Sequence, residues 1–125
     1  MREISELDKM GALAASCRRQ TLLYANLRQL AQTILGKLAL SRGDVGGVMS
    51  LFTDKQKILD DVMSEKNSVA ELVQWWQGEK LLLSHKQTAA DLNAAVAQLE
   101  KAITTFLDSE DQLERYLSHL TGKGQ

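Results

Sequence analysis

The sequence predicts an all-α protein of three long antiparallel helices, arranged as an up-down-up bundle with coiled-coil packing. Apolar residues recur at alternating steps of three and four through most of the chain, which is the spacing of a helical seam that packs on other helices. The 125 residues include no proline, the residue that most strongly interrupts a helix. The helices are expected at about residues 3–41, 44–77 and 79–120. Together they form a single domain, 1–125, whose last residues, 121–125, are a frayed tail.

The first helix is predicted from a seam that runs from Met10 to Leu38. The sequence Ser41-Arg42-Gly43-Asp44 marks its end. Glycine readily adopts the left-handed conformation that follows a helix, and an aspartate can cap the free amide groups of the next one. We therefore expect the first turn of the bundle at Gly43 and Asp44.

The second helix is predicted from a seam that runs without a slip from Val45 to Trp76. The polar stretch 64–68 resembles a loop, but the apolar phase continues straight through it. The pattern therefore favours one continuous helix with a local bend, and Gly78 marks the second turn.

The third helix has the most regular seam, which alternates three and four from Leu82 to Leu120. The residues 79–120 would span roughly 63 Å at about 1.5 Å per residue. A rod of this length cannot cover its own apolar edge. The other two helices must cover it.

Three charged residues occupy seam positions where apolar side chains are expected. Glu110 lies on the third seam, and Lys55 and Lys66 lie on the second. Charges at such positions are typical of a polar layer that fixes the register of a bundle. The alternatives are a snorkelling side chain near the bundle end or a ligand site.

The composition excludes several classes of function. With 44% apolar and 25% charged residues and a net charge of −1, the chain resembles an ordinary helical protein and shows no basic excess for nucleic acid. No apolar run approaches the roughly 20 residues that membrane insertion requires. The first ten residues lack the apolar core of a secretory signal. With a single cysteine, Cys17, these features favour a cytoplasmic protein.

The search for chemistry finds no catalytic residues, no metal ligands and no cofactor motif. The two histidines, His85 and His119, stand near opposite ends of the third helix and cannot share a metal. His119 precedes a Lys-Gly pair, which is a faint likeness to a phosphotransfer histidine. We expect no enzyme activity.

Large apolar residues off the seams suggest a partner site near the second turn. Trp75 and Trp76 are adjacent and therefore about 100° apart around a helix, so only one of them can face the core. The seam assigns Trp76 to the core. Trp75, Leu81 and Leu83 would then form an exposed patch of the kind that binds partners. The alternative is that the turn buries them as an end cap.

Small residues along the third helix suggest a second partner surface. Ala95 and Ala102 flank the seam and allow a close approach by another backbone. They would line a shallow groove for an amphipathic helix, with further contacts on the outer turns near Tyr116 and Leu117. The alternative is tight packing inside the bundle.

The segment 38–62 carries a recognisable pattern around the first turn. A helix ends in a Gly-Asp turn, and the next helix carries an apolar pair, an acidic-Lys-Gln segment and further apolar residues. These features are Gly43-Asp44, Leu51-Phe52, Asp54-Lys55-Gln56, Ile58 and Leu59. This pattern resembles the first-turn region of FlgN-type flagellar export chaperones. The similarity covers about residues 20–63 and the layout of long antiparallel helices.

The resemblance implies a small, non-enzymatic, cytoplasmic chaperone of a type III-like export system. Members of that family hold the C-terminal helical segments of hook-filament junction proteins, deliver them to the export gate and use no cofactor. The family offers no tight contact motif, so no individual contact residue is carried over. The alternatives are a structural coiled-coil scaffold that self-associates, for example as a homodimer, and a phosphotransfer helical bundle.

Overall fold

The computed structural model describes residues 5–79 and 86–121, and in these residues every regular element is helical. The predicted all-α class is confirmed, but with four α-helices instead of three. The elements are α1 (Glu6–Leu40), the short 3₁₀ helix η1 (Val45–Val48), α2 (Met49–Ser68), α3 (Ala70–Glu79) and α4 (Lys86–Thr121).

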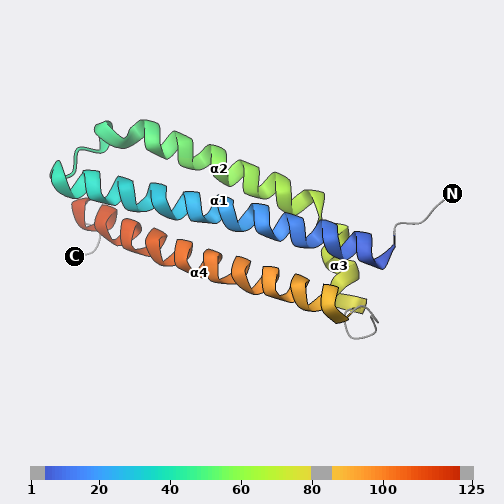
Figure 1. Cartoon of the computed structure of the whole chain (residues 1–125). Helices are drawn as coiled ribbons and strands as arrows, with labels where there is room; N and C mark the ends of the chain where they lie inside the picture. The colour runs from blue at the N-terminus through green and yellow to red at the C-terminus, as the bar shows by residue number, and fades with distance from the viewer. Residues whose placement is uncertain (1–4, 80–85, 122–125) are drawn as a thin grey trace.

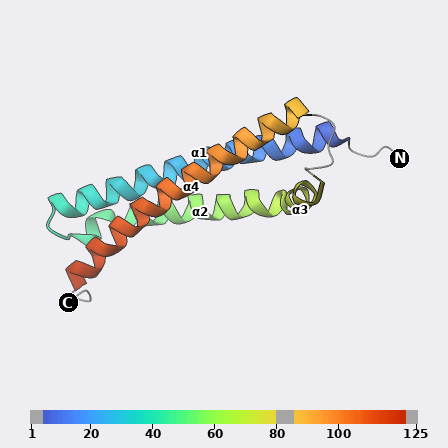
Figure 2. The same ribbon diagram turned by 90° about the horizontal axis from the view of Figure 1, so that it is seen from below.

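Helix α1 is the element on which the others assemble. It packs against α2, α3 and α4, whereas in the described part of the chain no Cα atom of α4 lies within 8 Å of one in α2 or α3. Helix α2 runs back along α1, and α4 runs in the same direction as α1 (Figure 1). Seen from below, α4 crosses the bundle obliquely, so it approaches α2 near the first turn and diverges from it toward α3 (Figure 2).

The first helix begins at a side-chain cap. The hydroxyl of Ser5 accepts a hydrogen bond from the amide of Asp8 at 3.1 Å, which satisfies one of the free donors at the helix start. Ser5 has extended backbone angles, so α1 begins at Glu6 and not at residue 3 as the sequence predicted. Its end at Leu40 lies one residue before the predicted one.

The predicted first turn is confirmed. Gly43 has a φ of +95°, in the left-handed region, and its amide donates to the carbonyl of Leu38 at 2.8 Å. The carboxylate of Asp44 accepts from the amide of Gly47 at 3.2 Å and so caps η1. The chain enters α2 through this single tight turn of helix.

The prediction of one helix over 44–77 is wrong, because the helix is interrupted at Val69. The hydroxyl of Ser68 donates to the carbonyl of Glu65 at 2.7 Å, and Val69 has φ −118° and ψ 11°. A serine that bonds locally to the backbone competes with helix continuation. Helix α3 then runs in a new direction through Gly78, so the turn predicted there is also wrong. The chain between α3 and α4, residues 80–85, lies outside the described residues.

Three apolar clusters lie along the rod and form its core. The cluster nearest α3 contains Met10, Leu13, Ala14, Cys17, Val69, Trp76, Leu92 and Ala95. The central cluster contains Tyr24, Leu27, Val62 and Phe106, with the rings of Tyr24 and Phe106 centred 5.7 Å apart. The cluster nearest the first turn contains Ala31, Ile34, Leu38, Val48 and Leu113. Each cluster draws on α1, which explains why this helix holds the others together.

Candidate functional site

The divergence of α4 from α3 leaves an apolar groove on the molecule. We call it the α3–α4 groove; its volume is about 540 Å³. Helix α1 forms the floor, α3 with the end of α2 forms one wall, and α4 forms the other. The lining residues are Leu13, Cys17, Gln20, Lys66, Val69, Ala70, Val73, Trp76, Gln77, Val96, Leu99 and Glu100.

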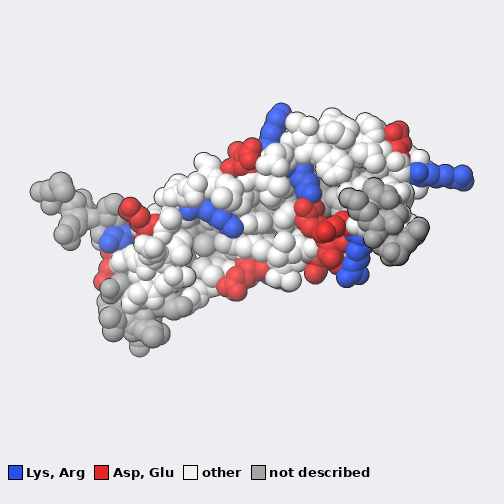
Figure 3. Space-filling view, turned by 180° about the vertical axis from the view of Figure 1, so that it is seen from behind, with Lys and Arg blue, Asp and Glu red and all other residues white. Residues whose placement is uncertain are grey.

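The groove joins core residues to exposed ones. Trp76 and Val69 are each only 6% exposed and belong to the core cluster nearest α3, whereas Val73, one turn away from each, is 37% exposed. Val96 and Leu99 on the facing wall are half-buried. Seen from behind, the half of the molecule near α3 shows white, uncharged surface interspersed with both acidic and basic side chains (Figure 3). An apolar surface of this form suits the non-polar face of another helix.

Glu65, near the end of α2, attaches this end of the helix to α1 just before the break that positions α3. Its carboxylate accepts hydrogen bonds from the hydroxyl of Ser16 at 2.7 Å and from two nitrogens of Arg19 at 2.9 and 3.0 Å. The hydrogen bonds from Arg19 and then Ser16 lower the pKa of the Glu65 carboxyl below its ordinary value, and the same contact raises the pKa of Arg19. The buried Ser16 hydroxyl in turn accepts from the side-chain amide of Gln20 at 3.2 Å. The end of α2 is thus fixed to α1 just before the chain turns.

Helix α3 itself is held by apolar and ring contacts. The ring centroids of Trp75 and Trp76 lie 6.4 Å apart, and the ammonium of Lys9 lies 5.1 Å from the ring centroid of Trp75. For residues 70–78, the part of α3 whose side chains the structure describes, no hydrogen bond or ion pair joins a side chain to another helix. The wall that α3 provides is therefore set by packing.

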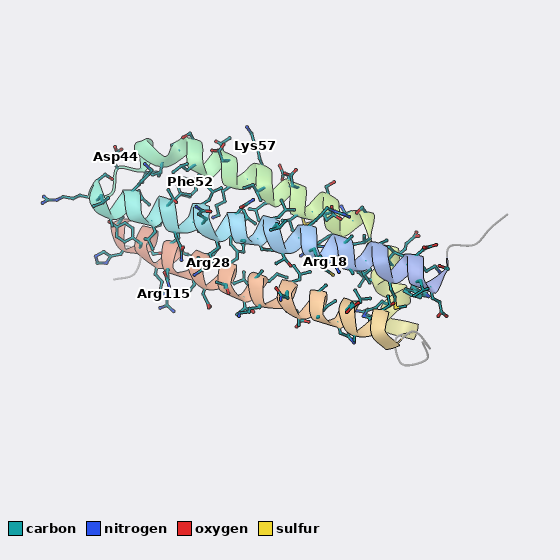
Figure 4. All side chains as sticks on the ribbon, viewed as in Figure 1. Arg18, Arg28, Asp44, Phe52, Lys57 and Arg115 are labelled. Atoms are coloured by element: carbon teal, nitrogen blue, oxygen red, sulfur yellow. The ribbon has the colours of Figure 1, made fainter. Side chains whose placement is uncertain are left out.

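A second shallow depression, of about 590 Å³, lies between α1 and α4 at the same half of the rod; we call it the α1–α4 groove. Its lining residues are Arg18, Thr21, Leu22, Asp91, Ala94, Ala95 and Gln98. Arg18 extends from α1 toward α4 at this place (Figure 4). Of the two alanines that the sequence analysis proposed for a groove, Ala95 lines this depression and Ala102 does not.

The structure places the predicted aromatic contacts at the α3 end. Trp76 faces the core, as predicted, and Trp75 is half-buried against the same cluster. Part of Trp75 is therefore accessible, but it does not stand free of the bundle. Leu81 and Leu83 lie outside the described residues and stay predictions.

The predicted contacts on the third helix lie against the core. Ala95 is 7% exposed and borders the α1–α4 groove, while Ala102 is half-buried against the central cluster. Tyr116 and Leu117 are half-buried near the first turn, where the Tyr116 hydroxyl donates to the carbonyl of Leu38 at 3.3 Å. These positions favour the tight-packing alternative for most of each side chain, and they do not meet Trp75 in one site.

Sequence reasoning missed the residues that face the α3–α4 groove. Val73, Val96 and Leu99 lie on the predicted seams and were expected to be covered by neighbouring helices. The seam pattern in the sequence is the same whether the apolar residue is covered by a neighbouring helix or that helix lies too far away to cover it. The available signal was the polar stretch 64–68, which directly precedes the break at Val69.

Two side chains with potential reactivity are Cys17, which lines the α3–α4 groove, and His119, near the first-turn end of the rod. Burial raises the pKa of the Cys17 thiol, which disfavours the reactive thiolate. His119 is exposed near the ion pair of Asp111 and Arg115, which meet at 2.9 Å. In the described part of the chain, no group of three or more histidine, cysteine or acidic side chains is placed to hold a metal. None of the described helices is long and apolar enough to cross a membrane.

Comparison of the chain with models of known protein families, with curated proteins and with solved structures gives no match. The candidate site therefore rests on the geometry of the two grooves.

Proposed function

We propose that the protein is a non-enzymatic cytoplasmic chaperone or adaptor that binds an amphipathic helix of an exported protein. The α3–α4 groove is the seat of that helix. The partner helix would lie along α1 between α3 and α4, with its apolar face toward Leu13, Val73 and Leu99. In this proposal α1, α2 and α4 form an up-down-up core. The partner helix completes the bundle at the end where α4 lies apart from α3.

The observation that carries this proposal is the apolar lining of a groove between two helices whose backbones lie apart. Among the described residues, α3 and α4 have no Cα atoms within 8 Å of each other, yet both pack on α1. Burying Val73 and the half-buried side chains beside it removes apolar surface from water, at about 25 cal/mol per Å² before the costs of ordering a partner. A helix with apolar residues at three- and four-residue spacing fits the groove chemically.

The resemblance of segment 38–62 to FlgN-type export chaperones supports the choice of partner. It implies a helical C-terminal segment of a hook-filament junction protein as the substrate, with no cofactor. The contacts proposed from the sequence at Trp75, Ala95, Ala102, Tyr116 and Leu117 extend beyond the groove. We retain Trp75, which lies on α3 beside the groove, as a contact of the bound helix.

A binding titration tests the proposal. The probes are synthetic C-terminal segments of the hook-filament junction proteins encoded in the same genome, titrated into the protein by isothermal calorimetry. We expect Val73→Glu to weaken binding at least tenfold, because it places a charge in the apolar seat. The matched control is Leu107→Glu, which adds the same charge at an exposed position of α4 outside the groove. Equal affinity in both variants, or no binding by the wild type, would overturn the proposal.

Self-association as a scaffold or homodimer is the second candidate. It is favoured by apolar side chains exposed at the first-turn end of the rod, where Leu40 is 89% and Met49 55% exposed. Sedimentation velocity separates the two proposals. A monomer at micromolar concentration supports the adaptor, whereas a stable dimer that Leu40→Glu dissociates supports the scaffold.

A further inference from the structure

Helices α2 and α4 carry two lysine–glutamate pairs that face each other along the rod. In the first pair, Lys55 of α2 and Glu110 of α4 meet at 2.6 Å. In the second pair, Lys66 and Glu100 stand on opposite walls of the α3–α4 groove. Of the described residues that line this groove, only these two are charged at neutral pH.

The two pairs are spaced alike on their helices. Lys66 follows Lys55 by eleven residues, and Glu100 precedes Glu110 by ten, so each step is about three helical turns in the same direction along the rod. The first pair closes because α4 approaches α2 near the first turn, whereas the second stands where α4 has diverged (Figure 2). The groove therefore separates Lys66 from Glu100, whereas the equivalent residues nearer the first turn, Lys55 and Glu110, form an ion pair.

Neither charge of the open pair is neutralised by a neighbour. Within residues 5–79 and 86–121, no ion pair includes Lys66 or Glu100. The ammonium of Lys66 lies 5.7 Å from the ring centroid of Tyr24, which is within the range of a cation–π contact with an uncharged partner. The two walls of the groove thus present opposite charges to whatever lies between them.

We propose that the α3–α4 groove selects an amphipathic helix whose two polar edges carry opposite charge, with the acidic edge beside Lys66 and the basic edge beside Glu100. This inference rests on the proposed helix-binding function and names the chemistry of the partner. Apolar contact supplies most of the affinity, and the two wall charges fix the direction in which the helix lies. Charges at the rim of an interface act mainly on orientation and partner choice.

Three designed peptides test this inference. Each has about 18 residues, five turns of helix, with the same leucine and alanine stripe. One peptide has a glutamate edge and a lysine edge, the second has glutamate on both edges, and the third has lysine on both. A helix can enter the groove in either direction, so the mixed peptide always has one matched orientation.

We expect the wild type to bind the mixed peptide about two- to fivefold more tightly than either other peptide, measured by fluorescence anisotropy at low ionic strength. Lys66→Glu makes both walls acidic and should shift the preference to the lysine peptide. Glu100→Lys makes both walls basic and should shift it to the glutamate peptide. In about 1 M salt the preferences should disappear, because the Debye length falls to about 3 Å.

Lys57→Glu is the matched control. Lys57 is an exposed lysine of α2 that points away from the bundle (Figure 4), so reversing its charge should leave the peptide order unchanged. Circular dichroism verifies that each variant is folded. If all three peptides bind the wild type and the order stays the same in Lys66→Glu and Glu100→Lys, the charge inference falls and the helix-binding function stands. If no peptide binds and the export segments do not bind either, both fall.

Discussion

The ammonium of Lys55 in α2 lies 2.6 Å from the Oε1 atom of Glu110 in α4 and joins two helices whose backbones do not touch in the described part of the chain. The two side chains are only 12% and 28% exposed, and the second carboxylate oxygen of Glu110 is buried without a hydrogen-bond partner. The partly buried Glu110 carboxylate therefore depends on the Lys55 ammonium to offset the cost of removing its charge from water.

We therefore expect Lys55→Leu to destabilise the fold by about 1–3 kcal/mol, since it leaves the Glu110 carboxylate partly buried and unpaired. Replacing both partners, Lys55→Leu with Glu110→Leu, should recover most of this loss. Urea unfolding followed by circular dichroism measures both values. A double variant no more stable than Lys55→Leu would show that the pair contributes through something other than its charges.

The central cluster should be the most sensitive apolar part of the rod. Phe106 is 5% exposed and packs on the ring of Tyr24, so Phe106→Ala should cost about 3–5 kcal/mol through lost burial and the cavity left behind. The neighbouring Leu107 is 57% exposed, and Leu107→Ala should change stability by less than about 0.5 kcal/mol. Comparable losses in the two variants would contradict the observed orientation of α4.

The same substitution should have opposite effects at two glycines. Gly43 has a φ of +95°, and a Cβ atom there would lie 3.0 Å from the Cδ2 atom of Leu120, so Gly43→Ala should destabilise by about 1–2 kcal/mol. Gly36 lies on the exposed face of α1 with nothing near its Cβ position, and Gly36→Ala should stabilise by about 0.5–1 kcal/mol. Thermal melting of the two variants gives the signs directly.

The contact between Glu65 and Arg19 should make stability depend on pH. The pKa of Glu65 is lower in the folded protein than its ordinary value of 4.5, so as pH falls the unfolded chain takes up this proton first. The contribution is complete above pH 4.5 and is lost as pH falls below it through the folded-state pKa. Glu65→Gln should therefore be less stable than the wild type at about pH 6, and the difference should shrink at about pH 3. A difference that does not vary with pH would argue against the lowered pKa.

Much of the fold follows from local patterns in the sequence. The three- and four-residue spacing identified the helical class, because that period describes one face of a helix whatever covers it. The first turn was predictable because Gly43 and Asp44 act on their immediate neighbours. The charged seam positions indicated a polar layer, and Lys55 and Glu110 do form a cross-helix pair.

The break at Val69 was not predictable from the apolar phase. Val62, Val69 and Trp76 keep their spacing on both sides of it, and neither proline nor glycine is present in the stretch 64–69. At the break Ser68 bonds to the backbone of its own helix, and beyond it Trp76 packs in a cluster with residues of α1, which is a long-range contact. The spacing of apolar residues carries no information about contacts between residues that are far apart in the sequence.

The sequence by itself determined that this chain is helical, where its first turn lies and which face of each helix is apolar. Only the tertiary structure decided that α1 is the central helix and that α4 leaves α3 far enough to open a groove. The physical reason is that a seam records which face of a helix is apolar, whereas the distance and angle between two helices depend on how all the side chains between them pack. That packing brings Lys55 to Glu110 and holds Lys66 apart from Glu100.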